Sequence, residues 1–211
     1  MRYLIDTGDA EQAKEALEMG LWGVTANPSM YAANGTTAEE FVRQILPCKA
    51  KLFTMEVIGE LEQMEKTAVD CARKYPGVVI KINFSADGLK LTRRLRERGI
   101  STAMTLIFSE EQASLAAQAG AEYVFVFVSR NDEAGEDGMG VVQACLSLKN
   151  LYPQLKIVAA SVRNRLQVRM LEKMEADFVT VSPQLLDRLL RHPLSVKGEE
   201  EFRKAMGKED A

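Results

Sequence analysis

Short apolar runs alternate along the chain with amphipathic stretches of helical period. The apolar runs that we expect to form strands are residues 3–6, 22–25, 52–57, 78–82, 102–108, 123–128, 156–161 and 177–182. Runs this apolar are typical of strands that are covered on both faces. Their alternation with helical segments predicts a parallel sheet with right-handed crossovers.

The expected helices follow the strands in turn. They include residues 10–19, 60–74, 85–98, 110–119, 141–151, 166–174 and 183–191. Eight strand–helix units predict an α/β fold, the (β/α)8 or TIM barrel. The alternative is a doubly wound sheet, which is disfavoured because neither G-x-G-x-x-G nor a P-loop follows any strand.

The length of 211 residues suits a single barrel domain that spans residues 1–211. The charged tail, about 195–211, carries Phe202 and Met206 four residues apart. This spacing predicts an extra C-terminal helix that lies on the barrel or on a neighbouring molecule.

The charge balance disfavours a nucleic-acid partner, because the net charge is −3 and such proteins usually carry a basic stripe. Basic residues do gather at 90–98, but Leu91 and Leu95 recur there at helical spacing, which favours the solvated face of a helix over a polyanion site. No apolar run reaches the roughly 18 residues that a membrane span needs. The first residues, MRYLIDTGD, are not typical of a signal peptide.

Cysteine and histidine are sparse. Cys48, Cys71 and Cys145 form no C-x-x-C pair, so we expect reduced thiols and a cytoplasmic protein. The single histidine, His192, cannot build a Ser-His-Asp triad or a histidine metal site. We therefore expect no metal.

Polar residues close most of the predicted strands, where barrel enzymes carry their chemistry. They are Asp6, Thr25, Asn27, Glu56, Lys81, Thr105, Arg130, Ser161 and Arg163. Lys81 is the most informative, because it interrupts a buried run and shares a face with Val79 and Asn83. Burial tends to lower the pKa of a lysine, and the neutral amine can attack a carbonyl to form a Schiff base. The alternative is a lysine that extends to solvent at the strand end.

Two carboxylates and two arginines fit the same chemistry. Asp6 and Glu56 can move protons, although Asp6 could instead cap the following helix. Arg130 and Arg163 can bind phosphate bidentately, or be ordinary surface arginines.

Hydroxyl and amide groups complete the set. Thr25, Thr105 and Ser161 can orient a substrate or a water, although such residues are usually structural. Asn27 and Pro28 form a turn signal at which a helix can start.

Several segments resemble the transaldolase and fructose-6-phosphate aldolase family, in its short bacterial branch. They are LIDTGD, GVTANPS (23–29), VVIKINFSADGL (78–89), residues 99–124, FVSRNDEAGEDGM (127–139) and VAASVRN (158–164). The resemblance implies a Schiff-base role for Lys81 and an acid/base role for Asp6. It implies that Glu56 transfers protons through a water that Thr105 helps to hold.

The resemblance also implies the binding residues. Thr25, Asn27 and Ser161 fall on positions that line the hydroxyls of the donor sugar. Arg130 and Arg163 fall on the phosphate-binding arginines.

The activity that the resemblance implies is transfer of a dihydroxyacetone unit from a ketose phosphate to an aldose phosphate. It needs no metal or organic cofactor. An aldolase that uses free dihydroxyacetone is the alternative. Aldolase members place glutamine near the Glu56 position and tyrosine at the Phe127 position, so Glu56 and Phe127 resemble the transaldolases.

Some positions depart from the family pattern. Transaldolases usually have asparagine at Ala103 and serine at Phe125, and the motif prolines are absent at Asn83 and Val126. Ala103 and Phe125 are therefore candidates for altered specificity, such as a sulfonated ketose. A sugar-phosphate-binding barrel without catalysis is a further alternative.

The expected partners are small sugar phosphates, with neither nucleic acid nor membrane. The resemblance implies a homo-oligomer, commonly a decamer of two pentamers, in which the C-terminal helix crosses to a neighbour.

Overall fold

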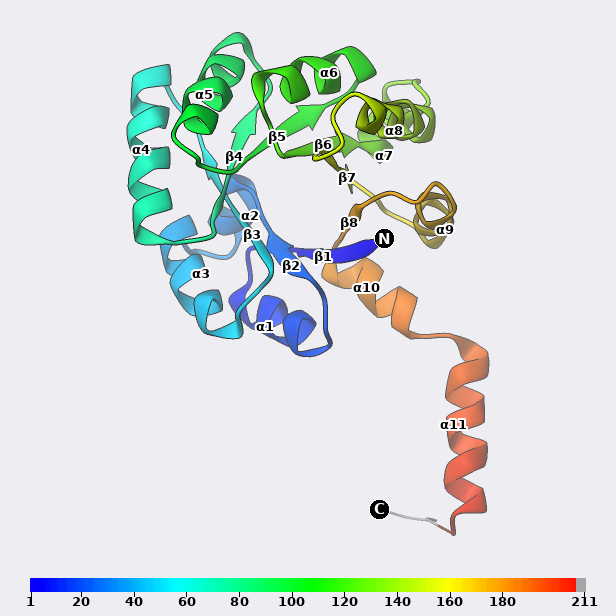
Figure 1. Cartoon of the computed structure of the whole chain (residues 1–211). Helices are drawn as coiled ribbons and strands as arrows, with labels where there is room; N and C mark the ends of the chain where they lie inside the picture. Colours follow the sequence, from blue (N-terminus) through cyan, green and yellow to red (C-terminus); the bar gives the residue numbers. More distant parts are fainter. Residues whose placement is uncertain (208–211) are drawn as a thin grey trace.

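Eight parallel strands close into a barrel in the order of the sequence, as predicted (Figure 1). This computed structural model describes residues 1–207. The strands are β1 (Arg2–Asp6), β2 (Gly23–Thr25), β3 (Leu52–Val57), β4 (Val79–Asn83), β5 (Thr102–Ile107), β6 (Tyr123–Phe127), β7 (Lys156–Ala160) and β8 (Phe178–Val181). The (β/α)8 barrel is therefore confirmed.

All helices except the last one lie around the barrel (Figure 1). They are α1 (Ala10–Glu18), α2 (Pro28–Ala33), α3 (Ala38–Ile45), α4 (Leu61–Lys74), α5 (Ala86–Glu97), α6 (Glu110–Ala119), α7 (Val128–Glu133), α8 (Gly138–Ser147), α9 (Arg165–Lys173), α10 (Pro183–Leu190) and α11 (Pro193–Ala205), with 3₁₀ turns η1 (Leu46–Cys48) and η2 (Leu148–Asn150). The expected helices are present, and Pro28 does start one, with Asn27 as its N-cap.

Two short helices were not predicted from the sequence. Helix α3 is preceded by its N-cap Thr37, which forms a capping box with Glu40. Helix α7 begins at Val128, which we had expected to end the sixth strand. An apolar run cannot distinguish the last residue of a strand from the first residue of a buried helix.

Alternation along the strands separates two apolar regions. Residues such as Ile80 and Ile82 point outward and pack beneath the helices. A second group fills the barrel interior, and we call it the inner apolar cluster. It consists of Leu4, Leu52, Val79, Ala103, Phe125, Val158, Ala160 and Phe178.

The start of α5 fixes the end of β4. A Cβ atom added at Gly88 would lie 2.3 Å from the backbone oxygen of Asn83, so only glycine allows this approach. Ser85 caps the helix by accepting a hydrogen bond of 2.9 Å from the Gly88 N–H. The strand that carries Lys81 is thus held directly against a helix start.

The basic stretch 90–98 lies on α5, as expected. Its side chains form ion pairs, which include Arg94 and Arg98 with Glu65. Among residues 1–207, no helix is long and apolar enough to span a membrane.

The expected C-terminal helix is present as α11, which points away from the barrel (Figure 1). None of its residues is buried, and Leu194, Phe202 and Met206 are all at least 70% exposed. The last part of the expected tail, 208–211, lies outside the described residues.

Candidate active site

A cavity of about 590 Å³ lies at the carboxyl ends of the strands. Eleven of the twelve residues singled out in the sequence line it: Asp6, Thr25, Asn27, Glu56, Lys81, Thr105, Phe125, Phe127, Arg130, Ser161 and Arg163. Ala103 does not line it. This residue is fully buried in the inner apolar cluster, together with Phe125.

Lys81 is buried at the base of the cavity, with 5% of its surface exposed. Its Nζ atom lies 3.1 Å from Oε2 of Glu56 and donates a hydrogen bond of 2.7 Å to the backbone oxygen of Ala26. The centre of the Phe125 ring lies 5.7 Å from the same nitrogen, within cation–π range. Lys81 therefore does not extend to solvent, and its amine is held inside the barrel.

Glu56 lies beside Lys81 because the two residues are partners in the register of β3 and β4. Their side chains are each 7% exposed. Oε2 of Glu56 is buried and has no hydrogen bond of good geometry, although it forms the ion pair. This oxygen can therefore accept a proton from the amine or a hydrogen bond from a bound molecule.

Asp6 does not cap the next helix. That cap is Asp9, whose Oδ1 accepts hydrogen bonds from the N–H groups of Glu11 and Gln12. Asp6 instead lines the cavity, where burial raises its pKa from 3.8 to about 6. The charge of Lys81 opposes this rise and the charge of Glu56 adds to it. A carboxyl group with such a pKa can exchange protons near neutral pH.

Tyr31 was not predicted from the sequence. Burial is the main cause that raises its pKa, and the charges of Glu56 and Asp6 add to the rise. A buried tyrosine on a short helix gives no signal in the sequence beyond that of a core residue.

The hydroxyl and amide groups have structural partners as well. The Thr54 hydroxyl donates to Oγ1 of Thr25 at 3.2 Å. Oδ1 of Asn27 accepts a hydrogen bond of 3.1 Å from the N–H of Met30 and so caps α2, which leaves its NH₂ group for the cavity. The structural and binding interpretations of Asn27 are thus compatible.

The two arginines on the cavity wall have different interaction partners. Arg163 forms an exposed ion pair with Glu133. The guanidinium of Arg130 lies 5.0 Å from the centre of the Phe127 ring. In the described part of the chain, Arg130 takes part in no ion pair, so its charge is available to an anion.

Leu106 enters the cavity through a distortion that the sequence does not reveal. The register of β5 shifts between Met104 and Ile107, and Leu106 has a φ of 59°. Thr105 and Leu106 both line the cavity as a result, although they are consecutive in a strand. Ser161 also has a positive φ, of 56°. Such strain is often found at functional sites.

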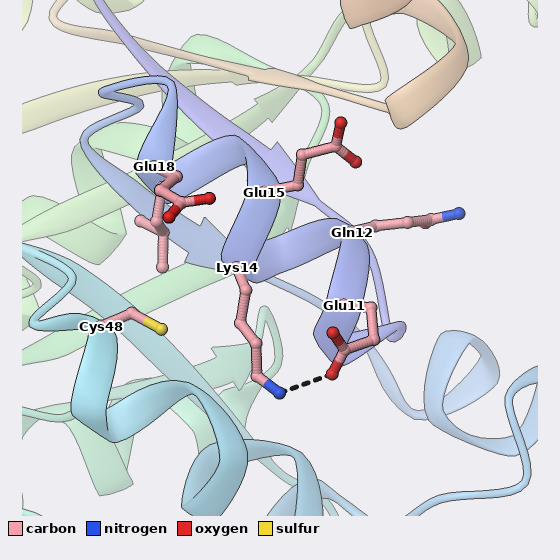
Figure 2. Close-up of a pocket in the computed structure, with 7 residues that line it drawn as sticks. Glu11, Gln12, Lys14, Glu15, Glu18 and Cys48 are labelled. Atoms are coloured by element: carbon pink, nitrogen blue, oxygen red, sulfur yellow. Dashed lines mark hydrogen bonds and ion pairs between the residues drawn. The ribbon is translucent and has the colours of Figure 1, made fainter.

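A second depression, of about 670 Å³, lies elsewhere between α1 and η1 (Figure 2). Its lining includes Glu11, Glu15, Glu18 and Cys48, and Lys14 is paired with Glu11. None of the candidate site residues predicted from the sequence lines this depression. The polar groups of the barrel mouth are therefore the better candidate site.

The fold and site define a class: a parallel (β/α)8 barrel whose mouth holds a buried lysine beside two carboxylates. The family model described as "Transaldolase/Fructose-6-phosphate aldolase" matches residues 3–211. The chain belongs to this family of enzymes.

Similar proteins in several organisms are named as members of the same family. A protein of Clostridioides difficile (strain 630) named "Probable transaldolase" is 37% identical over 97% of this chain and 96% of the relative. Proteins of the same name are 40% identical in Desulforamulus reducens over 96% of this chain and 95% of the relative, and in Syntrophobacter fumaroxidans over 97% and 96%.

Proposed function

We propose that the chain is a Schiff-base transaldolase that transfers a dihydroxyacetone unit from a ketose phosphate to an aldose phosphate. The observation that carries the proposal is the placement of Lys81. Its buried amine lies 3.1 Å from Glu56 in a cavity that also contains Asp6, Arg130 and Arg163.

The first steps form the covalent intermediate. The unprotonated amine of Lys81 adds to the C2 carbonyl of the ketose, and the resulting carbinolamine loses water to give an iminium ion. Glu56 is placed to take the proton from the Lys81 ammonium, and it returns a proton to the departing hydroxyl, through a water that Thr105 helps to hold. The 5.7 Å separation of Nζ from the Phe125 ring allows cation–π stabilisation of the iminium charge.

The next steps cleave and re-form a carbon–carbon bond. Asp6 accepts the proton of the C4 hydroxyl while the C3–C4 bond breaks, and the electron pair moves into the iminium to give an enamine. The aldehyde half leaves. An acceptor aldehyde then takes its place, the enamine attacks its carbonyl carbon, and hydrolysis releases the new ketose and the Lys81 amine. Arg130 and Arg163 bind the phosphate of each sugar.

The test is an assay that separates transfer from release. The protein is incubated with fructose 6-phosphate, with and without erythrose 4-phosphate, and the products are identified by mass spectrometry. The proposal expects glyceraldehyde 3-phosphate and a seven-carbon ketose phosphate, with little product when the acceptor is absent. Free dihydroxyacetone, formed without acceptor in the same amount as glyceraldehyde 3-phosphate, would favour the aldolase. Turnover of only a sulfonated ketose would favour the altered donor.

The assembly and compartment are part of the proposal. Helix α11 has no buried residue and exposes Leu194, Val196 and Phe202, which supports a homo-oligomer in which this helix contacts another copy. The three cysteines are free, which supports a reducing compartment such as the cytoplasm. Light scattering on the eluted protein tests the assembly, and a monomer would contradict it.

A further inference from the structure

Asn83 lies in the candidate active site but has no role in the mechanism above. It is the last residue of β4, two residues beyond Lys81 on the same face, and it lines the same cavity. Its Oδ1 atom is buried and, within residues 1–207, has no hydrogen-bond partner. An acceptor left in this state costs free energy, so its retention needs an explanation.

Neighbouring groups make Asn83 the available amide on its side of the cavity. Its partner in the register of β5 is Thr105. The β5–β6 side beneath is apolar, because Ala103 and Phe125 belong to the inner apolar cluster. Glu56, on the other side of β4, is engaged with Lys81. Asn83 and Thr105 are therefore the polar side chains that this side of the cavity offers to a hydroxyl group.

The direction of a bound sugar follows from the barrel. Arg130 and Arg163 follow β6 and β7, which are two and three strands away from β4 around the barrel. A ketose joined through C2 to Lys81, with its anionic end at these arginines, directs its longer arm toward β6 and β7. Its C1 hydroxymethyl group is then turned away from β6 and β7 and stays close to β4, the strand that carries Lys81 and ends at Asn83.

We propose that Asn83 determines donor specificity: its side-chain amide oxygen accepts a hydrogen bond from the C1 hydroxyl of the ketose. The terminal torsion of asparagine is soft, so the amide can rotate to turn the oxygen toward the cavity. The substrate hydroxyl then satisfies an acceptor that the empty protein leaves unpaired. This inference rests on the proposed function, because it assumes that the sugar is joined to Lys81.

The test compares two donors that differ at one atom, fructose 6-phosphate and 1-deoxyfructose 6-phosphate. Both release glyceraldehyde 3-phosphate during transfer to erythrose 4-phosphate, so one assay measures both. The wild type should favour the hydroxylated donor in kcat/KM by roughly 10- to 100-fold, because one hydrogen bond to the buried oxygen is not made with the deoxy donor. In Asn83→Ala this preference should fall to near unity, through loss on the hydroxylated donor alone.

Two further variants separate recognition from folding. Asn83→Leu keeps the side-chain shape without the amide and should behave as Asn83→Ala does. Asn150→Ala removes an exposed asparagine before β7, at the other end of the barrel, and should keep the wild-type preference. The melting temperatures of the Asn83 variants should equal or exceed that of the wild type, because the buried unpaired oxygen is gone.

The outcomes are distinct. A wild-type ratio near unity, or a preference that persists in both Asn83 variants, overturns the role of Asn83 while the transaldolase proposal stands. Borohydride reduction with each donor, followed by peptide mapping, reports on Lys81 independently. Absence of a Lys81 adduct with both donors, together with absence of turnover, overturns the proposed function and this inference with it.

Discussion

On the inward faces of β1 and β4, an apolar residue is followed two positions later by a charged one. Leu4 and Val79 lie in the inner apolar cluster, whereas Asp6 and Lys81 lie in the cavity above it. The strand geometry of the two positions is the same. The first residue of each pair, which we call the lower position, packs in the core, and the second, the upper position, lies in the candidate active site. Variants at the lower positions should therefore affect stability, and variants at the upper positions should affect activity.

The largest effect should come from the upper position of β4. Lys81→Met should reduce turnover by on the order of 10⁴-fold or more, because no other amine replaces the nucleophile. The measurement is the transfer rate per folded protein, with folding checked by circular dichroism. Since this variant leaves Glu56 buried without its partner, Lys81→Met/Glu56→Gln serves as the folded control. Activity retained in either variant would contradict the account.

The upper position of β1 should show the next effect. Asp6→Asn should lower kcat by about 10²- to 10⁴-fold, because the C4 hydroxyl loses its base. In the wild type, kcat/KM should rise with pH through about 6, where the raised pKa of Asp6 lets the carboxylate ionise. This acidic limb should be absent from the residual activity of the variant. If the acidic limb persisted unchanged in Asp6→Asn, a group other than Asp6 would be responsible for it.

The lower position of β1 should affect stability instead. Leu4 is fully buried, so Leu4→Ala should lower the free energy of unfolding by about 2–5 kcal/mol. Turnover per folded molecule should change little. Urea unfolding and the transfer assay measure the two quantities, and loss of turnover without loss of stability would remove the contrast between the positions.

Asp6 also links pH to stability. Its pKa is raised in the folded state, so the native protein binds this proton more tightly, and stability decreases as pH rises from about 4 to about 6. Asp6→Asn should thus be more stable than the wild type at pH 7, by on the order of 1–3 kcal/mol. The difference should vanish below about pH 3, where the Asp6 carboxyl is neutral in both the folded and the unfolded state. Equal stability of the wild type and Asp6→Asn at pH 7 would contradict the burial of a charged carboxylate at Asp6.

The smallest effect should come from glycine variants at two residues with a positive φ, one inside the candidate active site and one outside it. Ser161 and the exposed Glu175 have similar φ values, of 56° and 57°. Glycine at either position should raise the free energy of unfolding by about 0.5–1 kcal/mol. Only Ser161→Gly should also reduce kcat/KM, by about tenfold, because it removes a hydroxyl from the cavity. An equal effect of both variants on activity would contradict the role of Ser161.

Much of the fold and site could be predicted because both depend on local patterns. The alternation of apolar runs and helices specifies the barrel, and residues that close parallel strands must meet at one mouth. Lys81 was recognisable because a charge interrupts an apolar strand. Asp6 remained ambiguous between cap and acid until the structure showed that Asp9 is the cap.

Other features depend on pairing between distant segments. The backbone oxygen of Ala26 that accepts from Lys81 is supplied by another part of the chain, and side-chain identity does not encode it. The bulge that turns Leu106 into the cavity exists only when β5 and β6 pair. Ala103 was a candidate for altered specificity, but it is buried in the inner apolar cluster with Phe125 and does not line the cavity, and only the packed barrel reveals this.

The central claim is that Lys81 forms a covalent bond with the donor. The most direct measurement is borohydride reduction of the protein in the presence of fructose 6-phosphate, read by intact mass and peptide mapping. The account predicts the mass increase of a reduced sugar or dihydroxyacetone adduct on the peptide that contains Lys81, and none on the Lys81→Met variant. An adduct on another lysine, or turnover of this donor with no adduct, would contradict it.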